Sequence, residues 1–181
     1  RQMVRSFQQV WASLGTATTE LSQHEILTLA SVVEKETGQA AERPLIARVF
    51  LNRLKLGMPL QSDPTVIYGM GESFNGNLRR SDLRAPSSHN THAFPGLPPG
   101  PICSPGKAAL EAVLKPAHSD ALYFVSRNDG SHVFSKTLAE HNRAVQTYQR
   151  QAKKPQSQAN AAPSLTAPAP AQEKVDQGTA P

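Results

Sequence analysis

The chain has 181 residues with a single cysteine, and its 19 basic and 14 acidic residues give a net charge of +5. This length is enough for one domain with a substantial core. No apolar run approaches the roughly 20 residues that span a bilayer, and no dense basic block with interleaved aromatic residues indicates nucleic-acid binding. The lone Cys103 argues against an internal disulfide and against a zinc finger.

The first part of the chain is predicted to be helical. A helix is expected over residues 2–14, before Gly15. Ser22 has the place of an N-cap for a second helix, and Glu25, three residues later, completes a capping box. Gly38 has the place of a C-terminal stop. Two successive helices are therefore expected here.

A third helix is predicted from Pro44 to Gly57. Proline is favoured in the first turn of a helix, and the apolar residues that follow recur at helical spacing. The next stretch, residues 58–104, is punctuated by Pro, Gly, Asn and Ser. Because compact domains rarely hold so long an irregular segment, we expect it to form a binding surface.

The last part of the chain alternates helix and strand. A helix is predicted over residues 105–115, begun by a Ser-Pro pair. Residues 122–126 and 131–135 flank an Asn-Asp-Gly turn and predict a β-hairpin. A second capping box then starts a helix that runs over residues 137–151.

These elements predict an α+β fold. Residues 1–20 are interpreted as a linker helix, residues 21–152 as one domain, and residues 153–181, rich in Pro, Ala and Gln, as a disordered tail. The expected architecture is a helical segment, a loop-rich centre with short strands, a β-hairpin and a C-terminal helix.

The second predicted helix carries two acidic residues in its apolar sector. At about 100° per residue, the apolar side chains fill one broad arc, and both Glu34 and Glu36 fall inside it. Periodicity alone does not choose between the two glutamates. The opposite face, predicted to point to water, holds Thr28, Ser31 and Lys35.

Two interpretations of this acidic pair stay open from the pattern. A carboxyl group against apolar walls loses hydration, so its pKa rises and it can remain protonated near neutral pH as a general acid. The alternative is structural: both acids are held by Lys or Arg partners.

Several motifs extend over most of the chain, from about residue 27 to about residue 145. They are LASVVEKET at 29–37, VFLNRL at 49–54, GMPLQSDPTVIYG at 57–69, NTH at 90–92, GLPPGPI at 96–102, YFV at 123–125 and HVFSKTLAEHN at 132–142. Together, in this order and spacing, these stretches resemble the catalytic domain of the MltG-type (YceG-like) endolytic murein transglycosylases.

The resemblance implies cleavage of the β-1,4 bond between N-acetylmuramic acid and N-acetylglucosamine in peptidoglycan, leaving 1,6-anhydro ends. One carboxyl group then protonates the leaving oxygen and later takes the proton of the C6 hydroxyl. The family's catalytic glutamate corresponds to Glu36. Glu34 is given a supporting role, with an ion pair to Arg48 or Arg53. No cofactor or metal is implied.

The resemblance also implies residues that bind the glycan. Gln61 and Ser62 precede Asp63, which is expected to begin a turn or a helix. Gln61 is predicted to donate to a sugar or to Glu36 itself. Tyr68 is predicted to pack in the core rather than to stack under a sugar.

Further binding residues are predicted in the loops and the hairpin. Asn90 and Thr91 offer groups for saccharide recognition, although a loop-stabilising role is equally open. His92 stands where the family commonly has tyrosine. His132 and Phe134 share one face of a strand, and His132 is expected to face the groove. The GLPPG loop is expected to present rigid main-chain groups to the glycan through Gly96, Pro98 and Pro99.

A metal site at His89 and His92 is not expected, because catalytic zinc needs three protein ligands and no third candidate lies nearby. Two other functions remain possible alternatives. One is a two-carboxylate muramidase in which Asp63 or Glu34 positions water. The other is a noncatalytic peptidoglycan-binding module.

The resemblance implies a cellular setting as well. The expected substrate is nascent glycan strands at the periplasmic face of the cytoplasmic (inner) membrane. Family members carry an N-terminal membrane anchor and a LysM-like subdomain, which would precede Arg1, and cell-wall synthases are the implied protein partners. The glycan groove is expected to be walled by residues 61–69, 87–102 and 131–135.

Overall fold

The computed structural model describes residues 8, 11–12 and 20–150. The predicted tail over residues 153–181, and most of the predicted helix over residues 2–14, lie outside this part. Mixed helices and a small antiparallel sheet confirm the α+β class. The elements are α2 (Gln23–Glu36), η1 (Ala40–Glu42), α3 (Arg43–Lys55), α4 (Asp63–Met70), η2 (Gly71–Ser73), η3 (Asp82–Arg84), α5 (Lys107–Leu114), β1 (Tyr123–Ser126), β2 (His132–Ser135), α6 (Leu138–Val145) and the π-helical turn η4 (Gln146–Arg150).

Helix α2 begins with the predicted capping box. The Ser22 hydroxyl accepts a hydrogen bond from the Glu25 N–H, and the Glu25 carboxylate accepts one from the Ser22 N–H at 2.8 Å. The helix ends at Glu36, because Thr37 turns into extended backbone with φ −144°. The end lies two residues before the predicted stop at Gly38, so Glu36 is the last helical residue.

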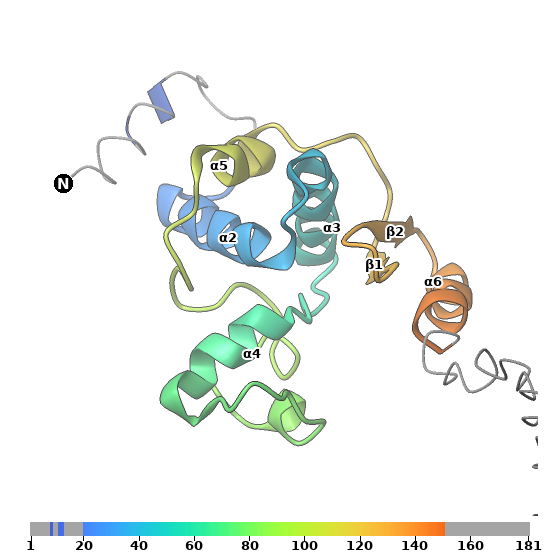
Figure 1. Ribbon diagram of the computed structural model, residues 1–181. Helices are drawn as coiled ribbons and strands as arrows, with labels where there is room; N and C mark the ends of the chain where they lie inside the picture. The colour runs from blue at the N-terminus through green and yellow to red at the C-terminus, as the bar shows by residue number, and fades with distance from the viewer. Residues whose placement is uncertain (1–7, 9–10, 13–19, 151–181) are drawn as a thin grey trace, which may run out of the picture.

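The core lies where α2, α3 and α5 meet, as Figure 1 shows. Its centre on α2 is the predicted apolar arc, in which every aliphatic residue but Leu27 is fully buried. Burial of such side chains is the main favourable contribution to folding, at roughly 1.5–3 kcal/mol each. The largest fully buried side chains of the three helices are Phe50, Ile26, Leu29, Ile46, Val32, Val33, Val49 and Val113.

The prediction that Thr28 and Ser31 face water is wrong. Both are buried. The chain at residues 102–103 covers Ser31, and the Thr28 hydroxyl donates to the His24 carbonyl of its own helix at 2.8 Å. The Ser31 hydroxyl donates to the Thr28 carbonyl at 2.7 Å and accepts from the Ile102 N–H at 2.9 Å. Hydroxyl side chains can be buried at low cost when their hydrogen bonds are satisfied locally. Of the three residues on that face, Lys35 alone is exposed.

Helix α3 holds the chain that leads into the hairpin. Its Arg48 side chain donates to the carbonyl of Ala117 at 2.7 Å, and Arg53 donates to the carbonyl of Leu122 at 2.6 Å. Neither arginine forms the predicted ion pair with Glu34. The guanidinium groups instead satisfy carbonyls of an irregular segment that has few backbone partners of its own.

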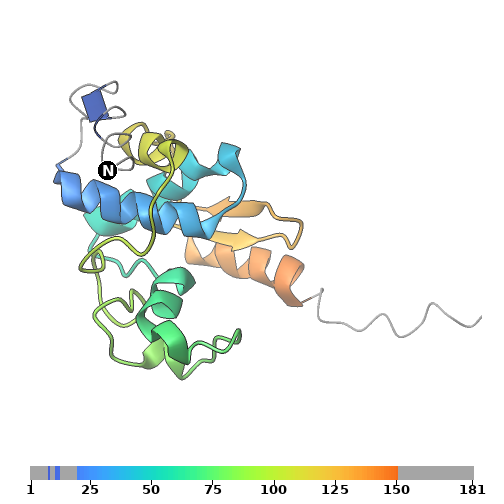
Figure 2. The same ribbon diagram turned by 60° about the vertical axis from the view of Figure 1, so that its left-hand side comes forward.

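The hairpin forms as predicted. Strands β1 and β2 pair antiparallel, with Phe124 opposite Phe134. The turn between them places Asn128 at φ 67° and Gly130 at φ 88°, conformations that Asn and Gly adopt readily. The Phe124 ring packs edge-on against Phe50 of α3, with ring centres 5.8 Å apart. In Figures 1 and 2 the hairpin lies between α3 and α6.

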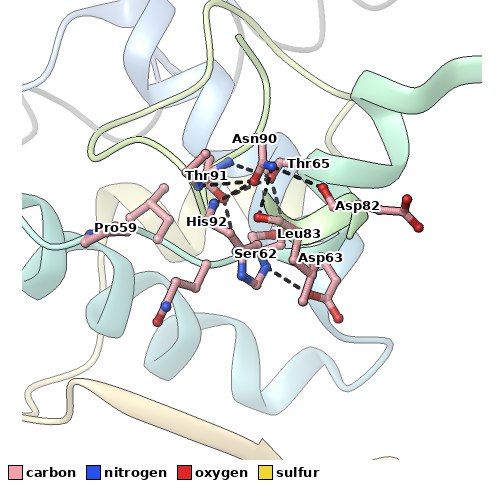
Figure 3. A network of polar contacts seen from close by, with 12 residues as sticks. Pro59, Ser62, Asp63, Thr65, Asp82, Leu83, Asn90, Thr91 and His92 are labelled. Atoms are coloured by element: carbon pink, nitrogen blue, oxygen red, sulfur yellow. Dashed lines mark hydrogen bonds and ion pairs between the residues drawn. The ribbon is translucent and has the colours of Figure 1, made fainter. Parts of the chain in front are cut away.

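The segment between α3 and α5 carries α4 and forms a lobe beside the helical core (Figures 1 and 2). Asn90 is buried inside this lobe, with 2% of its surface exposed. Its side-chain amide stabilises the lobe by donating to carbonyls of η3 and of the residue after it. Figure 3 draws two of these partners, Asp82 and Leu83. Within the described residues, no helix is both long and apolar enough to cross a membrane.

Glu34 ties α5 to α2 and α3. The Glu34 carboxylate accepts from the Gly106 N–H at 3.1 Å and lies 3.4 Å from Arg43. Gly106 is the N-cap of α5 and has no side chain to satisfy the free N–H groups there. Helix α5 therefore begins at Lys107, two residues later than predicted, and a glutamate from another helix supplies its cap.

Replacing Glu34 with alanine is expected to lower the stability of the folded chain by about 1–2 kcal/mol, because a helix cap and a partly buried ion pair are lost together. Thermal unfolding followed by circular dichroism measures this. The control is Glu111→Ala on α5, which removes an exposed ion pair to Lys107 at 3.6 Å and should cost about 0.5 kcal/mol or less. Equal, small losses in the two variants would contradict the capping role.

Candidate active site

Glu36 lies at the end of α2, beside the first residues of the α4 lobe. Its carboxylate accepts a short hydrogen bond from the Ser62 hydroxyl, and Ser62 is the N-cap residue of α4. The contact joins two parts of the chain that are 26 residues apart. The sequence predicted a donor to Glu36 in this segment, but at Gln61 rather than Ser62.

A cavity of about 410 Å³ opens at Glu36. Of the predicted site residues, Glu36, Gln61, His92 and His132 line this cavity. Ser62 is outside the lining and donates a hydrogen bond to Glu36. Side chains from α3, the hairpin and α6 complete the wall. The lining residues are Glu36, Arg53, Leu60, Gln61, Asp63, His92, Phe124, Val125, Ser126, His132 and His141.

Two buried threonine hydroxyl groups fix the position of Ser62 (Figure 3). The Thr91 hydroxyl accepts from the Ser62 N–H at 3.0 Å and lies 2.8 Å from the Thr65 hydroxyl, which donates to the Ser62 carbonyl at 2.6 Å. Ser62, Thr65 and Thr91 are each at most 3% exposed. We call these three residues the hydroxyl network. It holds the donor to Glu36 in one orientation.

Asn90 and Thr91 take the loop-stabilising role that the sequence left open beside saccharide recognition. The Asn90 carboxamide oxygen accepts from the His92 N–H at 2.9 Å, and its nitrogen donates to the carbonyls within the lobe. With these bonds and the hydroxyl network, both side chains are occupied inside the loop. Their effect on the cavity is indirect, through the positions of Ser62 and His92.

Burial raises the pKa of Glu36 to about 7. The hydrogen bond from Ser62 opposes this rise, as does the positive charge that His132 or His92 carries when its ring is protonated, whereas the nearby Asp63 carboxylate adds to it. Glu36 therefore exchanges its proton near neutral pH. A carboxyl with such a pKa can give up a proton and take it back without a large energetic penalty in either direction.

Two histidine–carboxylate pairs flank Glu36. His132 Nδ1 lies 2.7 Å from Glu42, and His92 Nε2 lies 2.9 Å from Asp63. The first pair is almost buried, with side chains 12% and 16% exposed, whereas Asp63 is 60% exposed. As predicted, Asp63 begins helix α4. His132 faces the cavity, which agrees with its expected position in the groove.

The GLPPG loop does not reach this cavity. Its Pro99 carbonyl lies 2.9 Å from His24 Nε2, at the start of α2. His24 and Glu36 are 12 positions apart on that helix, which is about 18 Å at 1.5 Å per residue. Pro98 is buried and Gly96 turns the chain with φ 93°. A role for this loop in binding a long glycan stays a prediction.

Several residues at or near the cavity were missed or misplaced by sequence reasoning. Arg53 is 6% exposed, and its guanidinium donates to the carbonyl of Leu60 and the side chain of Gln61. Nothing in its helical spacing indicates this. His141 joins the wall from α6, and burial, together with the charge of Arg53, lowers its pKa. Tyr68, predicted for the core, is 48% exposed and contacts His89 instead.

The comparisons with known proteins agree with one another. The model of the YceG-like family matches residues 1–147. The chain belongs to the YceG-like family. A crystal structure of a YceG-like protein from Listeria monocytogenes has 40% sequence identity and a TM-score of 0.64, over 77% of this chain and 43% of that one.

Two bacterial relatives of this family member carry the name endolytic murein transglycosylase. The Bacillus subtilis protein is 46% identical over 129 residues, which are 71% of this chain and 36% of that protein. The Streptococcus pneumoniae protein is 38% identical over 130 residues, which are 69% of this chain and 24% of that protein. The chain thus spans about a quarter to a third of the length of these relatives.

The described residues of this YceG-like chain do not bring together three or more His, Cys, Asp or Glu side chains that could hold a metal ion. His89 and His92, whose spacing suggested a metal site, have different partners. His92 pairs with Asp63, and His89 contacts the Tyr68 ring. The cavity offers one carboxyl that exchanges its proton near neutral pH, two paired histidines and a guanidinium. Such a set is suited to moving a proton at a bound polar substrate.

Removing the Ser62 hydroxyl is expected to raise the pKa of Glu36 further, because the hydrogen bond from Ser62 favours the ionised carboxylate. Ser62→Ala would be compared with wild type by NMR titration of ¹³C-labelled glutamate side chains. Ser88→Ala, at an exposed serine of the same lobe, is the control and should leave the Glu36 titration in place. An unchanged or lowered pKa in Ser62→Ala would contradict the role of this hydroxyl.

Glu36→Gln is expected to stabilise the fold at alkaline pH. Below pH 4.5 the folded and unfolded states both hold the Glu36 proton. Between 4.5 and about 7 the folded state holds it more tightly, so stability falls as pH rises and stays lower above 7. Glutamine does not ionise and escapes this loss. Melting temperatures should therefore differ at pH 8 and converge toward pH 4; a constant difference would argue against the raised pKa.

Proposed function

We propose that the chain is the catalytic part of an endolytic lytic transglycosylase that cleaves the β-1,4 bonds between N-acetylmuramic acid and N-acetylglucosamine in peptidoglycan. The observation that carries the proposal is the single buried carboxyl at the cavity, Glu36, with a pKa of about 7. The names of the relatives in Bacillus subtilis and Streptococcus pneumoniae support the same activity.

The first step is general acid catalysis by Glu36. Its protonated carboxyl donates to the glycosidic oxygen, the bond from that oxygen to the muramic acid C1 breaks, and N-acetylglucosamine leaves with a free C4 hydroxyl. Glu36 is then an ionised carboxylate at the cavity wall. The Ser62 hydroxyl favours this ionised form, so it stabilises the state that follows proton transfer.

The second step returns the proton. The C6 oxygen of the same muramic acid bonds to C1, and its proton passes to the Glu36 carboxylate. The ring closes as a 1,6-anhydro sugar, no water is consumed, and Glu36 is ready for another cycle. A pKa near neutrality suits both steps, because the carboxyl must be a competent acid and then a competent base.

The remaining site residues support binding of the glycan in this proposal. Gln61, His92 and His132 line the cavity beside Glu36. Gly96 and Pro99 would contact a more distant part of an extended strand, and the buried Pro98 would hold their loop in shape. Ser62, Asn90 and Thr91 act by holding other groups. Glu34 contributes through the start of α5.

The cellular setting is also proposed from the family. Glycan strands outside the cytoplasmic membrane would be the substrate, reached at its periplasmic face through a membrane anchor in the longer protein, with cell-wall synthases as neighbours. A two-carboxylate muramidase is the rival activity, since Asp63 is a second carboxylate in the cavity wall. Asp63 already pairs with His92, which favours one acting carboxyl over two.

Glu36→Gln is expected to reduce cleavage of purified glycan strands at least about 100-fold, the usual contribution of a general acid–base group. Mass spectrometry of the wild-type products should show ends that are one water lighter than reducing ends. Glu111→Gln, on α5 and outside the cavity lining, is the control for a neutralised glutamate.

Four outcomes would contradict the proposal. Reducing ends in the wild-type digest would favour the muramidase, and full cleavage by Glu36→Gln would remove Glu36 from the chemistry. An equal loss in a folded Glu34→Gln variant would reopen the choice between the two glutamates. Strand binding without any cleavage by the wild type would favour the noncatalytic module.

A further inference from the structure

The Glu42 carboxylate contacts two nitrogen atoms of His132, one in the backbone and one in the ring. One oxygen of its carboxylate accepts from the backbone N–H of His132 at 2.8 Å, and the other lies 2.7 Å from Nδ1 of the ring. The two side chains are 16% and 12% exposed. Glu42 ends η1 and His132 begins β2, so this contact joins the helical core to the hairpin beside the cavity.

The contact determines which ring nitrogen of His132 carries hydrogen. A carboxylate can only accept hydrogen bonds, so the nitrogen that faces it must be the donor. In the neutral ring Nδ1 is therefore protonated, and Nε2 keeps a free lone pair. Among the described residues, no hydrogen bond engages Nε2. His132 lines the cavity with Glu36, which leaves this lone pair available to a bound molecule.

Aromatic neighbours keep the ring in place. The Phe124 ring meets His132 edge-on with ring centres 5.5 Å apart, and Phe134 lies 6.5 Å away on the same strand face. These ring contacts and the hydrogen bond to Glu42 limit rotation of the imidazole, so the lone pair of Nε2 keeps one orientation.

Most of the other polar side chains of the cavity are hydrogen-bond donors or already have partners, so a hydrogen-bond acceptor for a sugar hydroxyl is still needed. Arg53 is a donor, and the side-chain oxygen of Gln61 already accepts from it at 3.3 Å. Glu36 is assigned to proton transfer, and its Oε1 is engaged by Ser62. Asp63 is paired with His92, and His141, farther round the wall, has a buried Nδ1 without a partner among the described residues. A glycan offers many hydroxyl donors, which Nε2 of His132 can accept.

We propose that Glu42 is a positioning residue: it fixes His132 in the tautomer with hydrogen on Nδ1, so that Nε2 accepts a hydrogen bond from a hydroxyl group of the glycan held at Glu36. This inference rests on the proposed function, since it assumes a glycan in the cavity. His92 has the opposite arrangement, because its Nε2 is the nitrogen bound to a carboxylate. The two histidines therefore differ in the ring nitrogen that a carboxylate binds.

The tautomer can be read directly by NMR of protein labelled with ¹⁵N-histidine. The chain has six histidines, and the His132 signals are assigned by their loss in His132→Asn. The Glu36→Gln background is used so that added glycan is not cut. We expect hydrogen on Nδ1 of His132 and none on Nε2. Glu42→Gln should change this pattern, because an amide can donate to Nδ1, whereas Glu111→Gln should not.

Binding of a peptidoglycan tetrasaccharide to the Glu36→Gln protein should then shift the Nε2 signal of His132. Hydrogen on Nε2 before binding, or a bound glycan that leaves the Nε2 signal in place, would overturn the inference. The tautomer is measured with Glu42 intact, so an unfolded Glu42→Gln variant would not remove the test. Failure of the proposed function is a separate result: wild-type protein would then yield no anhydro ends.

Kinetics add a second readout. In His132→Asn, the amide can occupy the position of Nδ1 and keep the hydrogen bond to Glu42, but no group replaces Nε2. In His132→Gln, the longer side chain can place its amide at the position of Nε2. We expect His132→Asn and Glu42→Gln each to lower kcat/KM about 10–100-fold, the range found for residues that orient a functional histidine. His132→Gln should lose less. Adding Glu42→Gln to His132→Gln should lower kcat/KM little further. Fully additive losses would contradict the proposal that Glu42 acts through His132.

Discussion

The site depends on one opposition, between burial of the Glu36 carboxyl and the hydrogen bond that Ser62 donates to it. Burial disfavours the charged form, and the carboxyl also ends helix α2, where the negative end of the helix dipole acts in the same direction. The Ser62 hydroxyl favours ionisation. The balance leaves a group that exchanges its proton near neutral pH.

Much of the fold serves to maintain that balance. Helix α2 is enclosed by α3, α5 and the chain that covers Ser31, so its last residue is held in a fixed place relative to the core. The hydroxyl network fixes Ser62 from the side of the α4 lobe. Arg53 joins the two sides, because its guanidinium bonds both the chain before Ser62 and the chain before β1. Stability and site geometry therefore share the same contacts.

The cavity wall is assembled from distant parts of the chain that each bring a polar group with a defined partner. Glu42 holds His132, Asp63 pairs with His92 and Arg53 holds Gln61. A group whose partner is fixed keeps its orientation before the substrate arrives, which lowers the cost of organising the site during the reaction. The proposed single-carboxyl mechanism needs this order, because one glutamate must serve both as acid and as base.

The sequence by itself determined the local structure. The two capping boxes, the Asn-Asp-Gly turn and the helical spacing of apolar residues act over a few residues, so α2, the hairpin and α6 begin where the pattern indicates. The spacing placed both glutamates of the EKE motif in the apolar arc of α2, but it did not choose between them; that choice came from the family resemblance.

Only the tertiary structure decided which partners these residues have. Ser31 is buried because a loop some 70 residues away covers it, and Glu34 pairs with Arg43 and caps α5 rather than meeting Arg48 or Arg53. The GLPPG loop lies at the far end of α2, while Glu42 and His141 reach the cavity region from segments with no chemical pattern of their own. Such contacts depend on how elements pack, and periodicity within one element carries no information about it.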